Sequence, residues 1–414
     1  MDAVAVKSLL RALISGFLLN GVNAIIGLAK MGIVSHSINP KLLTNYFLDL
    51  AIWGWFAING ESVRQSSRQS ITTFSWKSGL ISIKQEWKIL LPFTIFIIVS
   101  TQLTSLFNVR LSLTEILITI MSGWCFVYTS TYTGMLEAKG KVELANWVTL
   151  GSSVLTLPLF FLVSTHVGFD FLLGFYFLLN LIYGFLHLVV LSILSNLMIE
   201  NSLVSKSSDV LEFKKVLLFE SLPRVLIPFL IANISNEQEL YLYSVLIRIF
   251  LIYGIFAVSI NPIVALKGRI FSANIVDKVL MILGPFIFIF SSICIILFSK
   301  DLIVLVGATN IVPSIWDYFS FTLLGGVSIL TQPFIGSVTS GKLLNLRSKS
   351  ALLANIAIFI LLPILVKFWD SIGGFYALSL FQIIYFALLK KSLSKPRSFL
   401  TIKCIPSSIA NLFK

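Results

Sequence analysis

Long apolar stretches, separated by short polar segments, recur along the whole chain. Two of them, residues 282–298 and 351–366, carry no charged side chain. Runs of about 18 or more apolar residues are long enough to cross a bilayer as helices. An outer-membrane barrel would instead show alternating segments of about ten residues. The pattern therefore predicts an all-α integral membrane protein.

The apolar stretches predict about twelve transmembrane helices with short loops between them. The expected spans are residues 9–34, 42–62, 89–107, 115–136, 144–163, 170–198, 217–233, 241–264, 279–299, 317–340, 350–366 and 374–390. We expect two six-helix bundles around a central cavity, at residues 1–200 and 201–414, the second ending in a basic cytoplasmic tail.

A faint internal repeat, with an offset of about 200 residues, supports this division. Each half holds a glycine- and lysine-containing segment, then the tripeptide Leu-Ala-Asn, then a proline. In the first half these are residues 134–141, 144–146 and Pro158, and in the second half residues 336–342, 353–355 and Pro363. Because six crossings return the chain to the same side, both halves insert in the same orientation.

Composition and charge agree with a membrane protein. The chain is 57% hydrophobic and 12% charged, with a mean hydropathy of +0.95 and a net charge of +13. The basic residues are spread among short loops, which favours the positive-inside rule over nucleic-acid binding. Residues 9–34 are expected to act as a retained signal anchor, which leaves the N-terminus in the cytoplasm. About 24 of the 31 basic residues, Arg64 and Arg347 among them, then lie on the cytoplasmic side. Both termini are then cytoplasmic.

Three cations, Lys30, Arg224 and Arg248, fall inside predicted spans rather than in loops. An arginine at the centre of a membrane helix costs roughly 2.5–3.5 kcal/mol, so such a residue marks a site with an anionic partner. Arg248 has no acidic residue three or four positions away. Arg224 follows Glu220 by four residues, so the two can form an ion pair within one helix.

Arg248 is therefore the strongest candidate for an anion-binding residue. The planar guanidinium binds oxyanions bidentately and keeps its charge in a poorly solvated site. A structural arginine that donates to backbone carbonyls is the alternative. Lys30 has its own alternative, since its long side chain can reach the outer interface.

Small and polar residues form a stripe along the first helix, because Gly16, Asn20, Asn23, Gly27 and Lys30 recur at intervals of three and four. The stripe indicates either a cavity-lining face with Asn20 and Asn23 as substrate ligands, or tight helix packing through glycines and asparagine hydrogen bonds.

Asp49, on the second span, lies about five residues from its outer end and needs a partner or a proton. It is the candidate for coupling to H⁺ or Na⁺, and a structural ion pair or hydrogen bond is the alternative.

No cofactor or metal is expected. Three cysteines and three histidines have neither disulfide nor metal-ligand spacing. A membrane polymerase or acyltransferase would show a long outer loop or a compact His/Asp cluster, and neither is present. The sequence has no phosphate-cradling glycine loop of the kind that binds ATP for hydrolysis. Active transport would therefore draw on an ion gradient or the membrane potential.

Several segments resemble Wzx-type O-antigen flippases of the multidrug/oligosaccharidyl-lipid/polysaccharide (MOP) superfamily. They are the Asn39-Pro40 turn, residues 134–141 and 336–342, Leu222-Pro223-Arg224, and residues 243–248. The resemblance covers nearly the whole chain and implies an alternating-access carrier in the bacterial inner membrane. Related lipid II flippases carry arginines on their first, second and eighth helices. Arg248 matches the eighth helix, Lys30 stands on the first, and Asp49 replaces a basic residue on the second.

The resemblance also implies the substrate and partners. The substrate would be an undecaprenyl-diphosphate-linked oligosaccharide, moved from the cytoplasmic to the periplasmic leaflet for lipopolysaccharide biosynthesis. Its diphosphate would lie on Arg248, with Arg224 and Lys30. Polysaccharide polymerase and chain-length machinery would be the protein partners. An ion-coupled multidrug exporter of the same superfamily is the alternative, although it should favour acidic residues in the cavity.

Overall fold

The computed structural model describes most of the predicted spans as long helices. It describes residues 3–37, 113–138, 141–166, 208–265, 273–305, 313–338 and 341–394, with Gly60, Glu61, Arg64, Ile95 and five positions between 182 and 193. Within these ranges the elements are α1 (Ala3–Ser37), α4 (Leu113–Ala138), α5 (Val142–His166), α7 (Ser208–Ile234), α8 (Glu237–Ala265), α9 (Ala273–Leu305), α10 (Ile315–Ser337) and α11 (Gly341–Ser394). The described elements are all helices.

The described helices match nine of the twelve predicted spans, because α11 holds two of them. Most helices run several residues beyond the predicted spans. For example, α7 begins at Ser208, whereas its span was expected from residue 217. Hydropathy marks the part of a helix inside the hydrocarbon, and the polar ends continue outside it. The spans 42–62, 89–107 and 170–198 lie outside the described residues except for isolated positions, so the count of twelve stays a prediction.

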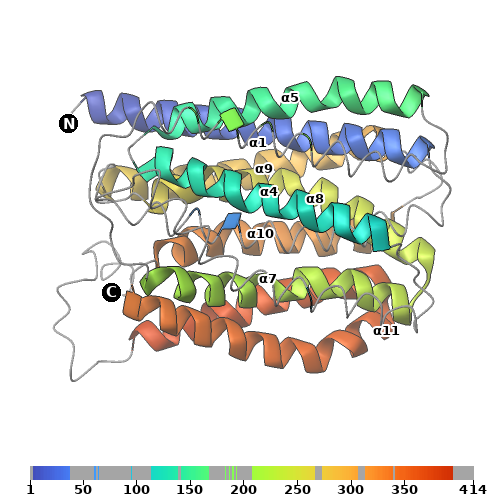
Figure 1. Ribbon diagram of the computed structural model, residues 1–414. Helices are drawn as coiled ribbons and strands as arrows, with labels where there is room; N and C mark the ends of the chain where they lie inside the picture. Colours follow the sequence, from blue (N-terminus) through green and yellow to red (C-terminus); the bar gives the residue numbers. More distant parts are fainter. Residues whose placement is uncertain are drawn as a thin grey trace.

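The helices lie side by side with their axes roughly aligned, some parallel and some antiparallel (Figure 1). α1 packs along α5 and α8, α7 packs along α11, and α10 packs against both α8 and α11. We call the end of this bundle where α1 begins the inner end, and the opposite end the outer end. The positive-inside count predicts that the inner end is cytoplasmic.

A sharp turn at the outer end divides α11 into two antiparallel limbs. Asp370 has φ of 48° and ψ of −125°, a positive-φ conformation that residues other than glycine rarely adopt. The next residue, Ser371, donates its backbone N–H to Glu239 at 3.3 Å, which ties the turn to the start of α8. The predicted spans 350–366 and 374–390 lie on the two limbs.

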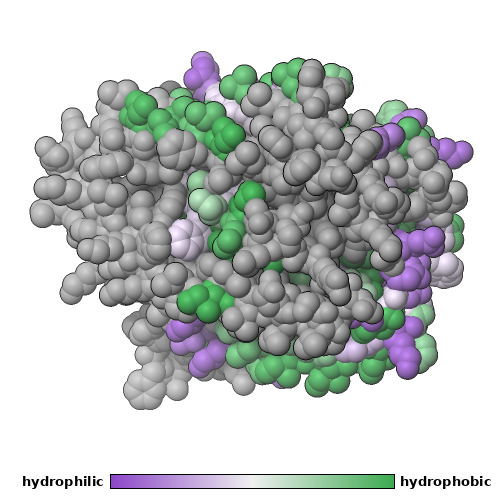
Figure 2. Space-filling view, turned by 45° about the vertical axis from the view of Figure 1, so that its right-hand side comes forward, coloured by the Kyte–Doolittle hydropathy of each residue, from purple (hydrophilic) through white to green (hydrophobic). Residues whose placement is uncertain are grey.

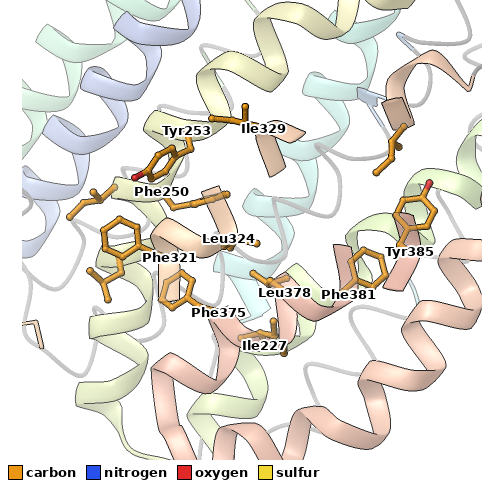
Figure 3. Close-up of a cluster of buried hydrophobic side chains, with 14 of the residues drawn as sticks. Ile227, Phe250, Tyr253, Phe321, Leu324, Ile329, Phe375, Leu378, Phe381 and Tyr385 are labelled. Carbon is orange, nitrogen blue, oxygen red and sulfur yellow. The ribbon is translucent and has the colours of Figure 1, made fainter. Parts of the chain in front are cut away.

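Aromatic and aliphatic side chains together fill the core between α7, α8, α10 and α11 (Figure 3). Tyr243 and Phe375 pack with ring centroids 4.9 Å apart. Gly374 lets the second limb of α11 come close, because a Cβ there would lie 2.8 Å from Ile227 and 3.0 Å from Tyr243. The core therefore depends on close helix contact at a small residue, as is usual for membrane helices.

Large apolar side chains cover much of the outer surface. On α9 alone, Ile282 is 72% exposed and Ile296 is 71% exposed. Figure 2 shows hydrophobic residues along the upper and lower sides, with hydrophilic residues mostly toward the right-hand end and a smaller group at the lower left. Among the described residues, four apolar segments are long enough to cross a membrane: Leu9–Ile33, Lys215–Ile234, Gln238–Ile255 and Leu343–Leu393. An apolar surface of this extent is suited to lipid rather than water.

Two asparagines at corresponding positions of the predicted repeat make corresponding contacts. Asn146 on α5 is buried and donates its side-chain amide to Ser15 of α1 at 3.1 Å. Asn355 on α11 is buried and donates to the backbone carbonyl of Phe219 on α7 at 2.5 Å. The α1–α5 and α7–α11 pairs are thus joined by the same residue type at equivalent places in the repeat.

Candidate functional site

Arg224 and Arg248 lie at the same depth in the bundle. α7 and α8 are antiparallel neighbours joined by Ser235 and Asn236. Arg224 precedes the last residue of α7 by ten positions, and Arg248 follows the first residue of α8 by eleven. At 1.5 Å per residue, both lie about 15–17 Å from the outer turn that joins the two helices.

Lys30 lies at this depth as well. α1 and α8 run in opposite directions (Figure 1), and Asn20 of α1 donates to Ser259 of α8 at 3.0 Å. From that contact, Lys30 is ten residues toward the outer end and Arg248 is eleven. The helical rise places the two within about 2 Å of the same depth. All three intramembrane cations therefore belong to one transverse layer, which we call the cation layer.

The three side chains differ in their exposure. Lys30 and Arg248 are half-buried, whereas Arg224 is exposed. Arg224 interacts electrostatically with the buried Tyr243 and with Glu220, but it makes no ion pair or hydrogen bond with a residue that the structure describes. The Arg224 side chain is therefore accessible at the same depth as Lys30 and Arg248.

The ion pair that Glu220 and Arg224 could form within α7 is not present. Glu220 instead accepts from Arg347, with Nε to Oε1 at 2.7 Å and Nη2 to Oε2 at 2.9 Å, and also from the Tyr385 hydroxyl. Arg347 reaches Glu220 from another helix, donates to both of its carboxylate oxygens, and is itself held by the Val338 carbonyl. The structure therefore removes the argument that ranked Arg224 below Arg248.

Arg347 was expected in a loop on the inner side, and the structure places it in a helix instead. α11 begins at Gly341, so Arg347 lies within its second turn, and its side chain is only 4% exposed. It also donates to the backbone carbonyl of Val338, at the end of α10, at 3.3 Å. Arg347 thus joins α7, α10 and both limbs of α11.

A second arginine assigned to an inner loop is likewise engaged in an ion pair. Arg64 binds Glu137, at the end of α4, and Glu61 at 3.4 Å. Glu137 is completely buried. Burial alone lowers the pKa of Arg64, but the charges of Glu137 and Glu61, with their hydrogen bonds, raise it above its usual value. Arg64 is therefore charged at every physiological pH.

Asn20 and Asn23 have different surroundings on α1. The Asn20 amide donates to the Gly16 carbonyl at 2.8 Å as well as to Ser259, so it takes part in packing between α1 and α8. The Asn23 side-chain oxygen is buried and has no hydrogen-bond partner among the described residues. A buried acceptor left unpaired costs about 1–3 kcal/mol, so this oxygen calls for a donor from water or a ligand.

The remaining predicted features are either outside the described residues or have only local contacts. Asp49 and the Asn39-Pro40 turn lie outside the described residues. His36 is engaged with the backbone carbonyl of Gly32 at 2.8 Å. In the described part of the chain, no cluster of three or more histidine, cysteine, aspartate or glutamate side chains is placed to hold a metal ion.

Solved structures of known transporters match this chain in fold. An outward-facing multidrug resistance MATE family transporter of the MOP superfamily has a TM-score of 0.65 at 14% identity, covering 94% of this chain and 96% of that one. A eukaryotic MATE transporter has a TM-score of 0.62 at 12% identity, covering 95% and 96%. Lipid II flippase MurJ, in an inward closed conformation, has a TM-score of 0.59 at 16% identity, covering 92% and 88%.

By its fold the chain is a multi-pass membrane protein that resembles MATE transporters and lipid II flippase MurJ. No model of a known protein family matches the chain, and no curated protein matches it in sequence. The likeness is therefore one of fold, at identities too low to carry a substrate with it.

Proposed function

We propose that this protein is a flippase that moves an undecaprenyl-diphosphate-linked oligosaccharide of the O-antigen type from the cytoplasmic to the periplasmic leaflet. The observation that carries the proposal is the cation layer, in which Lys30, Arg224 and Arg248 share one depth of the bundle. A diphosphate carries several negative charges and suits such a group of cations. The bacterial inner membrane, with both termini in the cytoplasm, is the proposed location.

Within this proposal the residues of the layer have distinct parts. Arg224 and Arg248 bind the diphosphate, and Lys30 adds a third positive charge. Asn23 lies seven residues from Lys30 toward the inner end of α1, and its unpaired oxygen accepts a hydrogen bond from a sugar hydroxyl. The lipid tail stays in the bilayer. An H⁺ or Na⁺ gradient, with Asp49 as the coupling residue, or the membrane potential supplies the energy.

An ion-coupled multidrug exporter is the second candidate, because MATE transporters share the fold. The charges in the bundle favour the flippase. An exporter of cationic compounds needs an available carboxylate, whereas in the described part of the bundle Glu137 and Glu220 are both engaged by arginines. The cation layer would repel a cationic drug and attract a diphosphate.

The proposal is tested first in cells. If the protein is the O-antigen flippase, Arg248→Ala and Arg248→Glu lower surface polysaccharide at normal protein levels, with the charge reversal the more severe. Unchanged polysaccharide in both variants contradicts the proposed site.

A second experiment separates transport from enzymatic chemistry. Purified protein in liposomes should translocate an unmodified lipid-linked glycan between leaflets. Elongation of the glycan or transfer of a group to it would identify a membrane polymerase or acyltransferase instead. Resistance to cationic drugs on expression, without glycan translocation, would identify an exporter.

A further inference from the structure

We propose that Arg347 is a positioning residue that keeps Arg224 available for an anionic ligand by occupying the carboxylate of Glu220. This inference rests on the proposed function, because it assumes that Arg224 binds an anion. Arg347 lies outside the cation layer, and the inference is that it keeps the positive charge of Arg224 within that layer.

The first step is that Glu220 and Arg224 are suited to pair with each other. They are four residues apart on α7, with the acidic residue nearer the N-terminus, which is the favourable order for an ion pair within a helix. Arg224 already interacts electrostatically with Glu220. If no other group bound Glu220, the two would neutralise each other.

The second step is that Arg347 prevents this pairing. It donates to both carboxylate oxygens of Glu220, at 2.7 and 2.9 Å, and Tyr385 donates its hydroxyl to one of them. Arg347 also donates to Tyr385 at 3.2 Å and to the Val338 carbonyl at 3.3 Å. These contacts come from three other segments of the bundle, so Glu220 is fixed in one direction.

The third step compares the two possible partners. Arg347 is 4% exposed, and a bidentate pair in a buried setting is strong once formed, since breaking it leaves an unpaired buried charge. Arg224 offers Glu220 only an ion pair within one helix, without supporting contacts from other segments of the bundle. Glu220 therefore stays with Arg347, and the positive charge of Arg224 is left for the ligand.

The test measures the reactivity of Arg224 and its ligand binding in the full-length protein in lipid nanodiscs. Phenylglyoxal modifies accessible arginines, and mass spectrometry gives the extent of modification at residue 224. In Arg347→Gln, Glu220 is released toward Arg224, and modification of Arg224 should fall by about fivefold, as expected for a new ion pair near 1 kcal/mol. Arg347→Gln combined with Glu220→Gln should restore it.

Two further variants keep the test decisive if Arg347→Gln folds poorly. Arg347→Lys keeps the charge but loses the planar fork, so it should give an intermediate modification of Arg224. Glu220→Gln alone should leave modification of Arg224 within twofold of the wild type. A severalfold rise in Glu220→Gln would show that Glu220 was paired with Arg224 from the start, and this would overturn the inference.

Binding of farnesyl diphosphate, a short prenyl diphosphate, separates this inference from the proposed function. We expect Arg347→Gln to weaken binding about fivefold, and to have no further effect in an Arg224→Gln background. If Arg224→Gln weakens binding but Arg347→Gln does not, the flippase site stands and the inference fails. If neither Arg224→Gln nor Arg248→Gln weakens binding, the proposed site fails, while the modification of Arg224 still decides the role of Arg347.

Discussion

Arg347 holds both carboxylate oxygens of Glu220, at 2.7 and 2.9 Å, and so joins the first limb of α11 to α7. A comparable pair, Arg64 with Glu137, lies at the inner end of α4. Among the described residues, each predicted half of the chain thus holds an arginine–glutamate pair with a buried member. Such pairs fix which helices meet and in what register, because an unpaired buried charge is very unfavourable.

The pair at the end of α4 gives a stability prediction. Glu137→Ala leaves the Arg64 guanidinium without its main partner and should lower the free energy of unfolding by about 3–5 kcal/mol. The decrease is read from thermal unfolding in detergent. Replacing both residues together, with Arg64→Leu and Glu137→Leu, should recover most of the loss. A Glu137→Ala variant as stable as the wild type would contradict the role given to this pair.

Gly325 on α10 gives a packing prediction. A Cβ there would lie 2.6 Å from the ring of Tyr253, which is fully buried and engaged with Ser292 at 3.0 Å. Gly325→Ala forces this ring to move and should cost about 1–3 kcal/mol in thermal unfolding. Gly254→Ala on α8 is the matched control, because nothing lies within 4 Å of a Cβ at that position. Equal stability of the two variants would show that the α8–α10 contact is looser than described.

The two repeat asparagines should have similar importance. Asn146→Leu and Asn355→Leu each remove a hydrogen bond between helices, which contributes about 0.6 kcal/mol on average and up to about 1.7 kcal/mol in membrane proteins. Both should lower the unfolding temperature. Asn233→Leu is the control, because Asn233 is exposed and bonds only within α7. A loss in only one of the two buried variants would count against equivalent roles in the repeat.

The contact between α1 and α8 can be trapped. An ideal Cβ at Gly16 lies 3.4 Å from the Cβ of Ser259, close to the separation of about 3.5–4.5 Å in disulfides. In a background without the native cysteines, Gly16→Cys with Ser259→Cys should form a disulfide on oxidation. If the predicted halves move against each other here, oxidation should stop transport, and reduction should restore it.

The control for this cross-link is Gly21→Cys with Ser259→Cys. Nothing lies within 4 Å of a Cβ at Gly21, so this pair should not join. Full transport by the oxidised, cross-linked protein would show that α1 and α8 stay together throughout the cycle.

Much of the fold follows from the periodicity of the sequence. Uninterrupted apolar runs must form helices in a bilayer, because every backbone polar group needs an internal partner there. This argument predicted the nine spans on the described helices. Hydropathy did not give their ends, since polar turns such as residues 208–216 continue the helix beyond the apolar run.

The candidate site was harder to predict, because charge pairing between distant segments is not visible in local spacing. Glu220 was assigned to Arg224 by the interval of four residues, whereas its partner lies 127 residues away. The sequence did hold a signal: Glu137 and Glu220 are acidic residues within or beside apolar spans and need cations. The likeness of fold to MATE transporters and MurJ agrees with the MOP resemblance and leaves the substrate as a proposal.

The most direct measurement is translocation of an undecaprenyl-diphosphate-linked oligosaccharide by purified protein in liposomes, with Arg224→Gln and Arg248→Gln compared with the wild type. Arg11→Gln is the matched control, because Arg11 is an exposed arginine near the inner end of α1, away from the cation layer. We predict that the wild type and Arg11→Gln translocate the substrate, and that each cation-layer variant loses at least about tenfold in rate, the effect of about 1.4 kcal/mol. Equal rates in all four proteins, or no translocation by the wild type, would contradict the proposed function.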